Sequence, residues 1–353
     1  MAARDLPWRR TRDPYAIWIS EIMLQQTQVN TVIPFWERWL RELPTIAATA
    51  AASPAKIHKL WEGLGYYTRV RNLQKAAQVM VAQHGGQFPQ TFDEVLALPG
   101  IGRYTAGAVC SIAFNEPVPI LDGNVIRVLC RVFGIAENPK EKITNQKLWQ
   151  LAEQLVVQAI ESAPEKSIRG KSPPVLRASH LNQSLMELGA LICTPRSPQC
   201  LICPIQKRCV AYRQQRTEEL PNLGKREPAT ARRFVAFIVH RNGRLLVRQR
   251  PAGVVNGHLW EFPNVEVAVQ CPPEEAAILL FGGAPQELSP LVTVKHSITR
   301  YRMTLDAFRV RLAQSPGKEL GVWKTPAQIR QLAFSSAHKK LASAAFESIM
   351  TDR

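Results

Sequence analysis

Long apolar runs are missing from this chain. None of its segments approaches the ~18 consecutive apolar residues that a membrane-spanning helix needs. Residues 1–15 also lack the apolar core of a signal peptide, and although they contain several arginines, Asp5 and Asp13 argue against a transit peptide. We therefore expect a soluble, cytoplasmic protein that makes no membrane contact.

Acidic residues are scarce relative to basic ones. The 353 residues include 45 lysines and arginines but only 28 aspartates and glutamates, giving a net charge of +17. The excess is spread out, with +9 over residues 1–225 and +8 over residues 226–353, so no basic tail accounts for it. A folded polycation favours a polyanionic partner, most often nucleic acid, and a basic surface without a binding role is the alternative. With 46% apolar residues the chain can bury cores, which excludes wholesale disorder.

Dispersed, even-numbered cysteines, the mark of a secreted disulfide framework, are also lacking. Four of the seven cysteines fall within 17 residues and predict a metal site in a reducing compartment: Cys193, Cys200, Cys203 and Cys209. Four thiolates without a histidine suit either an iron–sulfur cluster or an all-cysteine zinc site. The first spacing is wider than in zinc knuckles and favours a [4Fe–4S] cluster. Cys110, Cys130 and Cys271 lie in apolar patterns typical of core residues.

Strand-like runs are scarce over residues 14–190, where helical apolar patterns alternate with proline and glycine breaks. Asp13-Pro14 predicts an N-cap followed by proline at the first helical position. Further helices are expected at residues 31–43, 53–61, 68–84, 91–97, 103–114, 124–133, 144–161 and 178–192. No repeat period is evident.

The pattern changes after the cysteines. Residues 217–232 contain two prolines and one glycine among charged residues, and they are predicted to be a linker. Asn242-Gly243 between two strand-like runs, 234–240 and 244–250, predicts a tight β-hairpin because both turn positions need a positive φ. Further strands are expected at 291–296 and 301–311, and helices at 273–281, 326–333 and 336–350. The predicted fold is an all-α module followed by a smaller α+β module.

A glycine turn, residues 98–107 (LPGIGRYTAG), joins two expected helices. Gly100 and Gly102 allow backbone N–H groups and the next helix N-terminus to approach a phosphate closely. An ordinary helix–helix turn is the alternative. The basic chain and the carboxylate that follows favour DNA-backbone binding without base reading.

Several motifs together resemble one family. The glycine hairpin, Asp122 within residues 121–125 (LDGNV) and the cysteine spacing are similar to the endonuclease III, or helix-hairpin-helix, superfamily of DNA repair glycosylases. Residues 7–9 (PWR), 20–27 (SEIMLQQT), 63–67 (GLGYY) and 186–190 (MELGA) resemble its MutY-type adenine DNA glycosylase branch. The resemblance is dense over residues 5–212. It implies a helical glycosylase domain over 1–216 with a [4Fe–4S] loop at 193–209, the linker at 217–232, and a Nudix-like lesion-recognition domain over 233–353.

Two positions distinguish this branch from the glycosylase/lyases. Where the lyases carry a Schiff-base lysine after the hairpin, this chain has Tyr104, which cannot form one. Glu21 lies within a helix among Ile19, Ile22 and Met23, a setting absent from the lyases. The resemblance therefore implies a monofunctional glycosylase.

Cleaving the N-glycosidic bond of adenine requires an acid for the purine and a negative charge near the sugar. Glu21, desolvated by apolar neighbours, would have a raised pKa and act as the acid. Asp122, before a helix N-terminus, would be held ionised by N–H groups and the helix dipole. The resemblance assigns these roles and gives Tyr104 and Asn124 the task of orienting the two carboxyls. A salt-bridged mid-helix Glu21 and a simple N-cap Asp122 are the structural alternatives.

The resemblance also implies DNA-contacting residues, because adenine must leave the stack to be excised. Trp8, Arg9, Leu24 and Gln183 would line the adenine pocket. Other positions expected to touch DNA are Gln26, Thr27, Leu64 and Tyr66. Gln26 and Tyr66 would fill the gap beside the opposite base, although a core tyrosine is the alternative for Tyr66.

Residues 259–263 (LWEFP) resemble the Nudix-like domain in which related enzymes read 8-oxoguanine. The glutamate cluster that Nudix hydrolases use to hold Mg²⁺ is missing, because Glu274-Glu275 continues into an apolar run. In the loop at residues 296–300, the family's Phe-Ser-His is replaced by Ile298, Thr299 and Arg300. Ser297, Thr299 and Arg300 are the predicted contacts to the damaged guanine or its phosphate.

The sequence thus predicts a monomeric, nucleoid-associated enzyme that excises adenine from duplex DNA carrying 8-oxoguanine:adenine or guanine:adenine mispairs. The alternative within the superfamily is a pyrimidine-specific glycosylase/lyase. A non-catalytic DNA-damage binder and a nucleotide hydrolase are alternatives from other classes.

Overall fold

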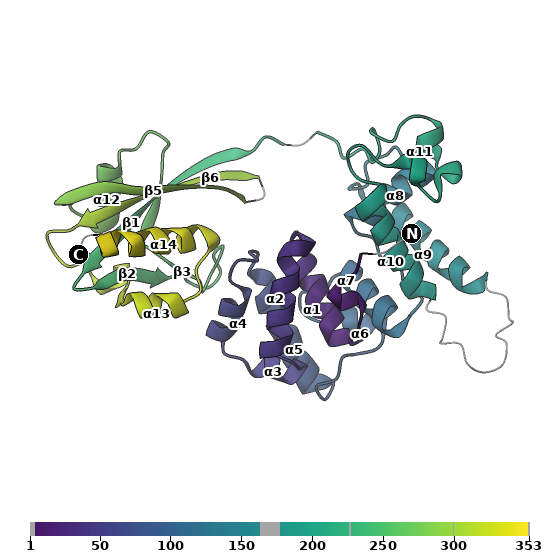
Figure 1. Cartoon of the computed structure of the whole chain (residues 1–353), viewed down its shortest axis with the longest axis horizontal. Coiled ribbons are helices and arrows are strands. Elements are labelled where there is room, and N and C mark those ends of the chain that lie inside the picture. Colours follow the sequence, from purple (N-terminus) through teal and green to yellow (C-terminus); the bar gives the residue numbers. More distant parts are fainter. Residues whose placement is uncertain (1–3, 163–176, 226, 299, 352–353) are drawn as a thin grey trace. The chain divides into compact units, whose positions relative to one another are not determined.

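The computed structural model describes residues 4–162, 177–225, 227–298 and 300–351. By their internal contacts the residues form two compact units: Met1–Ala51 with Arg71–Arg226, and Ala52–Val70 with Glu227–Arg353. The predicted fold class, a helical module followed by an α+β module, is confirmed (Figure 1). No helix in the described ranges is long and apolar enough to cross a membrane.

Unit 1 is built from helices. Its elements are α1 (Pro14–Leu24), α2 (Val29–Glu42), α3 (Ile46–Ala51), most of α5 (Thr68–Gln83), α6 (Phe92–Leu96), α7 (Arg103–Val109), α8 (Gly123–Phe133), α9 (Lys142–Glu161), α10 (Arg177–Glu187) and α11 (Val210–Arg213). The amphipathic α8 is central to one core, in which Val125, Leu129 and Cys130 pack against Leu148 of α9. This packing fixes the N-terminus of α8, which presents Asp122.

Several helix ends match their sequence signals. The Asp13 side chain accepts a hydrogen bond from Tyr15 N, with Pro14 at the first helical position. Two predicted helices differ in their last turns: 103–114 changes to a π-helix at Cys110–Phe114, and 178–192 does so at Leu188–Ile192. Single π-turns of this kind are rare, and no apolar pattern in the sequence indicated them. α3 has no polar–apolar periodicity, and the sequence analysis missed it.

Unit 2 is a mixed sheet between helices. Its strands are β1 (Thr230–Arg241), β2 (Arg244–Gln249), β3 (Trp260–Glu261), β4 (Asn264–Val267), β5 (Glu287–Ile298), β6 (Tyr301–Arg311) and β7 (Val322–Lys324), and its helices are α4 (Pro54–Trp61), α12 (Pro273–Phe281), α13 (Pro326–Gln331) and α14 (Ser336–Thr351). The strand order is β3-β2-β1-β6-β5, with β4 on β1 and β7 on β2. β1 pairs in parallel with β6 and antiparallel with β2 and β4.

Side chains of β1 alternate between two cores, as the period of a strand requires. Val235 and Phe237 pack on one face with Ala276 and Ala277 of α12. On the other face, Ala236 packs in the core that α14 covers (Figure 1). Because β1 is buried on both faces, it has the nearly continuous apolar pattern seen in its sequence.

The predicted hairpin is present. Asn242 and Gly243 have φ values of 49° and 70°, and Arg241 pairs with Arg244 across the turn. The predicted linker 217–232 is too long by three residues, since Thr230, Ala231 and Arg232 already pair with β6. Strands β3, β4 and β7 are two to four residues long, too short for an alternating pattern to reveal them.

Residues 52–70 differ from the predicted domain partition, which placed them in the helical domain. They belong to unit 2, because Glu62 accepts a hydrogen bond from Phe334 N at 2.9 Å and the Tyr67 hydroxyl donates to Phe334 O at 3.3 Å. The rings of His58 and His258 stack with centroids 6.0 Å apart. These contacts join residues far apart in sequence, which no local pattern reveals.

Candidate functional site

Glu21 is a buried acid on α1, an almost wholly buried helix of unit 1. Every residue of α1 from Tyr15 to Met23 is buried, and Glu21 is only 3% exposed. The pKa of Glu21 is raised to about 7, chiefly by burial and also by the nearby charge of Asp122. A hydrogen bond from Tyr104 and the charge of Arg9 act in the opposite direction. A carboxyl with this pKa exchanges a proton near neutral pH.

Tyr104 is the partner of this acid. It lies in the first turn of α7, directly after the glycine hairpin, and its hydroxyl donates to Glu21 Oε2 at 2.8 Å. Burial raises the pKa of Tyr104 well above its usual value, and the charges of Glu21 and Asp122 raise it further. The side chain is therefore a neutral hydrogen-bond donor, with no amine to attack a sugar.

Asp122 is the N-cap of α8. Its Oδ1 accepts a hydrogen bond from Val125 N at 2.7 Å, and its Oδ2 accepts one from Asn124 Nδ2 at 2.9 Å. The sequence analysis expected these N–H groups and the helix dipole to hold Asp122 ionised. The hydrogen bonds and Arg127 do lower the pKa of Asp122, but burial raises it and outweighs them.

Arg127 links Asp122 to the cysteine loop. One turn along α8, it is 9% exposed, and its guanidinium donates to Asn124 Oδ1 at 2.9 Å, to Gly189 O at 2.8 Å and to Cys193 O at 2.7 Å. The same Asn124 amide holds Asp122, so one chain of hydrogen bonds joins Cys193 to that carboxylate. The sequence analysis missed Arg127, although its i, i+3 spacing from Asn124 was a usable signal.

A narrow cavity of about 50 Å³ opens beside Glu21. Four of the predicted adenine-pocket residues line it: Trp8, Arg9, Leu24 and Gln183. The cavity is otherwise mostly apolar, with Ile17, Ile112 and Met186 among its walls. Tyr104, Asp122 and Asn124 are outside this lining, and Tyr104 connects to it through its hydrogen bond to Glu21. The Gln183 amide donates to Ser179 Oγ at 2.9 Å, which fixes its orientation.

A second buried carboxylate, Glu187, pairs with both arginines that line this cavity. Glu187 Oε1 accepts from Arg9 Nη2 at 2.7 Å and from Arg4 Nη2 at 2.6 Å. Burial alone would raise the pKa of Glu187, but these donors outweigh burial and lower it to about 2. Arg4 was missed in the sequence analysis, because 183 residues separate it from Glu187 and no local pattern connects the two.

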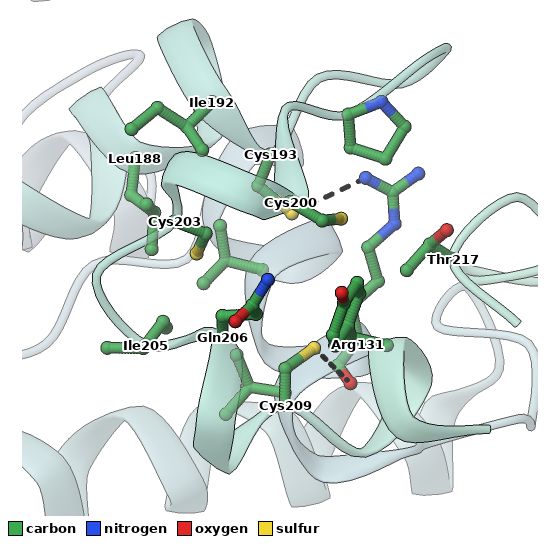
Figure 2. Close-up of a pocket in the computed structure, with 14 residues that line it drawn as sticks. Arg131, Leu188, Ile192, Cys193, Cys200, Cys203, Ile205, Gln206, Cys209 and Thr217 are labelled. Carbon is green, nitrogen blue, oxygen red and sulfur yellow. Dashed lines mark hydrogen bonds between the residues drawn. The ribbon is translucent and has the colours of Figure 1, made fainter. Parts of the chain in front are cut away.

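All four clustered cysteines line one pocket (Figure 2). Val128, Leu188, Ile192 and Ile205 form its apolar wall. Arg131, 2% exposed, donates from Nη1 to Cys193 Sγ at 3.4 Å and to Thr194 O at 2.7 Å, and from Nε to Leu220 O at 2.8 Å. Burial raises the pKa of Cys200, and the three neighbouring cysteines raise it further. Four thiolates in this space would repel one another unless a cationic centre lay between them, which an iron–sulfur cluster or zinc would supply. Within the described ranges no three histidine, cysteine or acidic side chains are grouped closely enough to hold one metal ion.

The glycine hairpin connects α6 to α7. Gly100 has a φ of +75°, and a Cβ there would lie 2.4 Å from Asn72 Cβ, so a side chain fits neither the conformation nor the space. Gly102 is the N-cap of α7, and a Cβ there would meet nothing within 4 Å. Gln26 is exposed with a φ of 56°, and Thr27 follows it in the turn after α1.

Unit 2 contains a larger pocket of about 430 Å³. It is lined by residues 63–68, Val255, Asn256, His296, Ser297 and residues 335–337, and therefore includes the predicted Leu64, Tyr66 and Ser297. Tyr66 is 41% exposed and has a φ of 48°, which is unlike the core tyrosine considered as its alternative. The lining therefore offers serine hydroxyls, a histidine and an exposed phenol as hydrogen-bonding groups.

Two other residues predicted to contact the lesion are not placed in this pocket. Thr299 lies outside the described residues. The Arg300 side chain is 62% exposed and covers the Tyr301 ring at 5.3 Å, without lining the pocket.

The acidic residues of unit 2 are used for structure. Glu274 and Glu275 are exposed in the first turn of α12. Glu261 is 3% exposed and pairs with Arg248 at 2.8 Å and with Arg250.

Three segments match known families. Residues 19–154 match the HhH-GPD superfamily of base excision DNA repair proteins, residues 193–209 the iron-sulfur binding domain of endonuclease III, and residues 234–344 the NUDIX domain. Rat adenine DNA glycosylase is 35% identical, over 96% of this chain and 74% of that protein. The human enzyme is 34% identical, over 96% and 70%.

Among solved structures, a thermostable thymine-DNA glycosylase is 32% identical, with a TM-score of 0.50 over 60% of this chain and 89% of that chain. The rat and human relatives, which align along almost the whole chain, are both adenine DNA glycosylases. The two modules of this chain match the HhH-GPD and NUDIX families. The chain therefore belongs to the adenine DNA glycosylase family of base excision repair, with an endonuclease III iron–sulfur binding domain and a C-terminal Nudix domain.

Proposed function

We propose that this protein excises adenine opposite 8-oxoguanine in duplex DNA, by acid-catalysed hydrolysis of the N-glycosidic bond without lyase chemistry. The observation that carries the proposal is the environment of Glu21. A carboxyl buried to 3% exposure, with a pKa of about 7, lies at a cavity and contacts a tyrosine hydroxyl. A proton donor of this kind suits a purine leaving group.

In the proposed reaction, adenine leaves the base stack and enters the cavity widened around it, against Trp8 and Arg9. Protonated Glu21 gives its proton to N7 of the purine as the C1′–N9 bond breaks. The bonding electrons leave with the base, so adenine departs neutral and the sugar becomes an oxocarbenium ion. Tyr104 holds Glu21 Oε2 and so orients the acid.

Asp122 would face the sugar cation. Its ionised form stabilises the positive charge or bonds to C1′ transiently, and water then completes hydrolysis to leave an abasic site. The amides of Val125 and Asn124 favour that ionised form, and they fix which oxygens stay available. Because burial raises the pKa of this group, ionisation depends on these donors and on Arg127.

The four cysteines would hold a [4Fe–4S] cluster, which would cross-link the 193–209 loop beside Val128 and Arg131 of α8. The spacing of the cysteines and the apolar lining support a cluster over zinc. Lys207 and Arg208 in the same loop would then contact phosphates, as would the hairpin at Gly100 and Gly102.

The pocket of unit 2 would receive the base opposite adenine. Ser297 and Tyr66 at its wall offer a hydroxyl and an aromatic ring to an oxidised purine. We propose that the enzyme acts as a monomer on 8-oxoguanine:adenine and guanine:adenine mispairs.

The test is release of free adenine from a duplex with one 8-oxoguanine:adenine mispair. We expect release by the wild-type protein and a fall of about 100-fold or more for Glu21→Gln, the usual contribution of a positioned acid. Equal activity of the two proteins would overturn the proposal. A pyrimidine glycosylase/lyase would instead release a pyrimidine and form a covalent DNA adduct under borohydride, which Tyr104 in place of a lysine makes unavailable.

A further inference from the structure

Glu62 is a buried carboxylate at the C-terminal end of α4. Its side chain is 5% exposed, and both oxygens have partners. Oε1 accepts a hydrogen bond from Phe334 N at 2.9 Å. Oε2 accepts from Lys59 Nζ at 3.0 Å and from Lys339 Nζ at 2.9 Å. The carboxylate thus joins residues 52–70 to the segment that enters α14.

The receiving segment belongs to the rigid core of unit 2. Phe334 is 2% exposed and its ring stacks on Phe262 with centroids 5.9 Å apart. Two further bonds reach the same segment from residues 52–70: Lys59 Nζ donates to Leu332 O at 2.9 Å, and the Tyr67 hydroxyl donates to Phe334 O. Among these residues, Glu62 accepts three hydrogen bonds and carries a buried charge. Its loss should therefore weaken the contact between residues 52–70 and the Phe334 segment most.

The position of this contact relates it to the pocket of about 430 Å³. Residues 63–68 follow Glu62 directly, and residues 335–337 follow Phe334 directly. Both segments line the pocket, together with His296 and Ser297. The bond from Phe334 N to Glu62 therefore lies where two walls of the pocket begin, and it fixes the distance between them.

We propose that Glu62 is a positioning residue for selecting the base opposite adenine, through its hold on the two walls of this pocket. The inference rests on the proposed function. Two bases that differ in a few hydrogen-bonding atoms are distinguished only if the donors and acceptors around them are fixed. Loosening the walls weakens that distinction and leaves the proton transfer from Glu21 intact.

The test compares single-turnover adenine release from 8-oxoguanine:adenine and guanine:adenine duplexes. Glu62→Ala removes every bond of the carboxylate, whereas Glu62→Gln keeps an oxygen for Phe334 N and loses the charge and the acceptor for Lys59 and Lys339. We expect the ratio of the two rates to fall roughly 10-fold in Glu62→Ala, the equivalent of one hydrogen bond. Part of that ratio should return in Glu62→Gln, with the guanine:adenine rate changed less than twofold throughout.

Glu266→Ala is the matched control, because Glu266 is an exposed carboxylate of unit 2 that pairs with Arg232. It should leave the ratio unchanged. If Glu62→Ala does not fold, Lys339→Met, which removes one donor at the protein surface, should still lower the ratio. An unchanged ratio in Glu62→Ala, or an equal fall of both rates, would overturn the inference. Failure of the proposed function is distinct, since wild-type protein would then release adenine from neither duplex.

Discussion

The hydroxyl of Tyr104 lies 2.8 Å from Oε2 of Glu21, although 83 residues separate them in the chain. α1 buries the acid among apolar side chains, and the glycine hairpin delivers the donor that contacts it. The same tyrosine occupies the place where a lysine would make a lyase. One hydrogen bond thus orients the acid and limits how far burial raises its pKa.

Replacing Tyr104 by phenylalanine should shift the pH dependence of adenine release. The hydrogen bond lowers the pKa of Glu21, so its loss should raise that pKa above about 7 and keep the acid protonated to higher pH. We expect the alkaline limb of the pH–rate profile to move up by about one pH unit. The control is Tyr15→Phe, which removes another buried hydroxyl, on α1, that donates to Leu43 O. This control should not move the alkaline limb. An unmoved limb in Tyr104→Phe would refute this role.

The stability of the protein should also depend on the ionisation of Glu21. The folded-state pKa, about 7, is higher than the unfolded value of 4.5, so the folded state binds the proton more tightly. The free energy of unfolding should therefore fall as pH rises from about 4.5 to 7. Glu21→Gln cannot ionise and should be more stable than wild type at pH 8, by up to roughly 3 kcal/mol. Urea unfolding at pH 5 and pH 8 measures this difference, and a gap that does not widen at pH 8 would count against it.

Arg127 should control the ionisation of Asp122. Its charge lowers the pKa of that aspartate, and its guanidinium holds Asn124, which binds Asp122. Arg127→Met should raise the pKa of Asp122 and shift the acidic limb of the pH–rate profile upward, with Arg127→Lys shifting it less. Ser179→Ala, a change near Gln183 that leaves this hydrogen-bonded chain intact, serves as the control. The claim fails if the acidic limb of Arg127→Met matches that of wild type.

Removing one cysteine of the cluster loop should abolish the chromophore and lower the melting temperature. Cys200→Ser would remove one of the four proposed cluster ligands that cross-link residues 193–209, so we expect loss of visible absorbance and iron, with weaker DNA binding. Cys271→Ser in unit 2 should keep both colour and stability. A colourless, zinc-containing wild-type protein with full activity would contradict the [4Fe–4S] assignment.

Local signals in the sequence were sufficient for some features. The N-cap at Asp13, the Asn242-Gly243 turn and the long amphipathic helices were predicted because each depends on neighbours within a few residues. The family resemblance predicted the adenine-pocket residues Trp8, Arg9, Leu24 and Gln183. In the structure all four line one cavity.

Long-range contacts were not predictable in this way. Three sets of contacts join positions that are far apart in the sequence. They are the ion pairs of Glu187 with Arg4 and Arg9, the hydrogen bond from Arg127 to Cys193 O, and the hydrogen bond from Phe334 N to Glu62. The raised pKa of Asp122 was also missed, because its sign depends on how deeply the N-cap is buried. Helix capping is readable from sequence, whereas desolvation depends on the folded surroundings.

The most direct test of the account is the single-turnover rate of adenine release from pH 5 to pH 9. If Glu21 supplies the proton, the rate should decline above about pH 7, tenfold for each further pH unit, as the acid loses its proton. Glu21→Gln should show no such decline. A wild-type rate that stays level or rises through pH 9 would contradict the central claim that Glu21 is the acid.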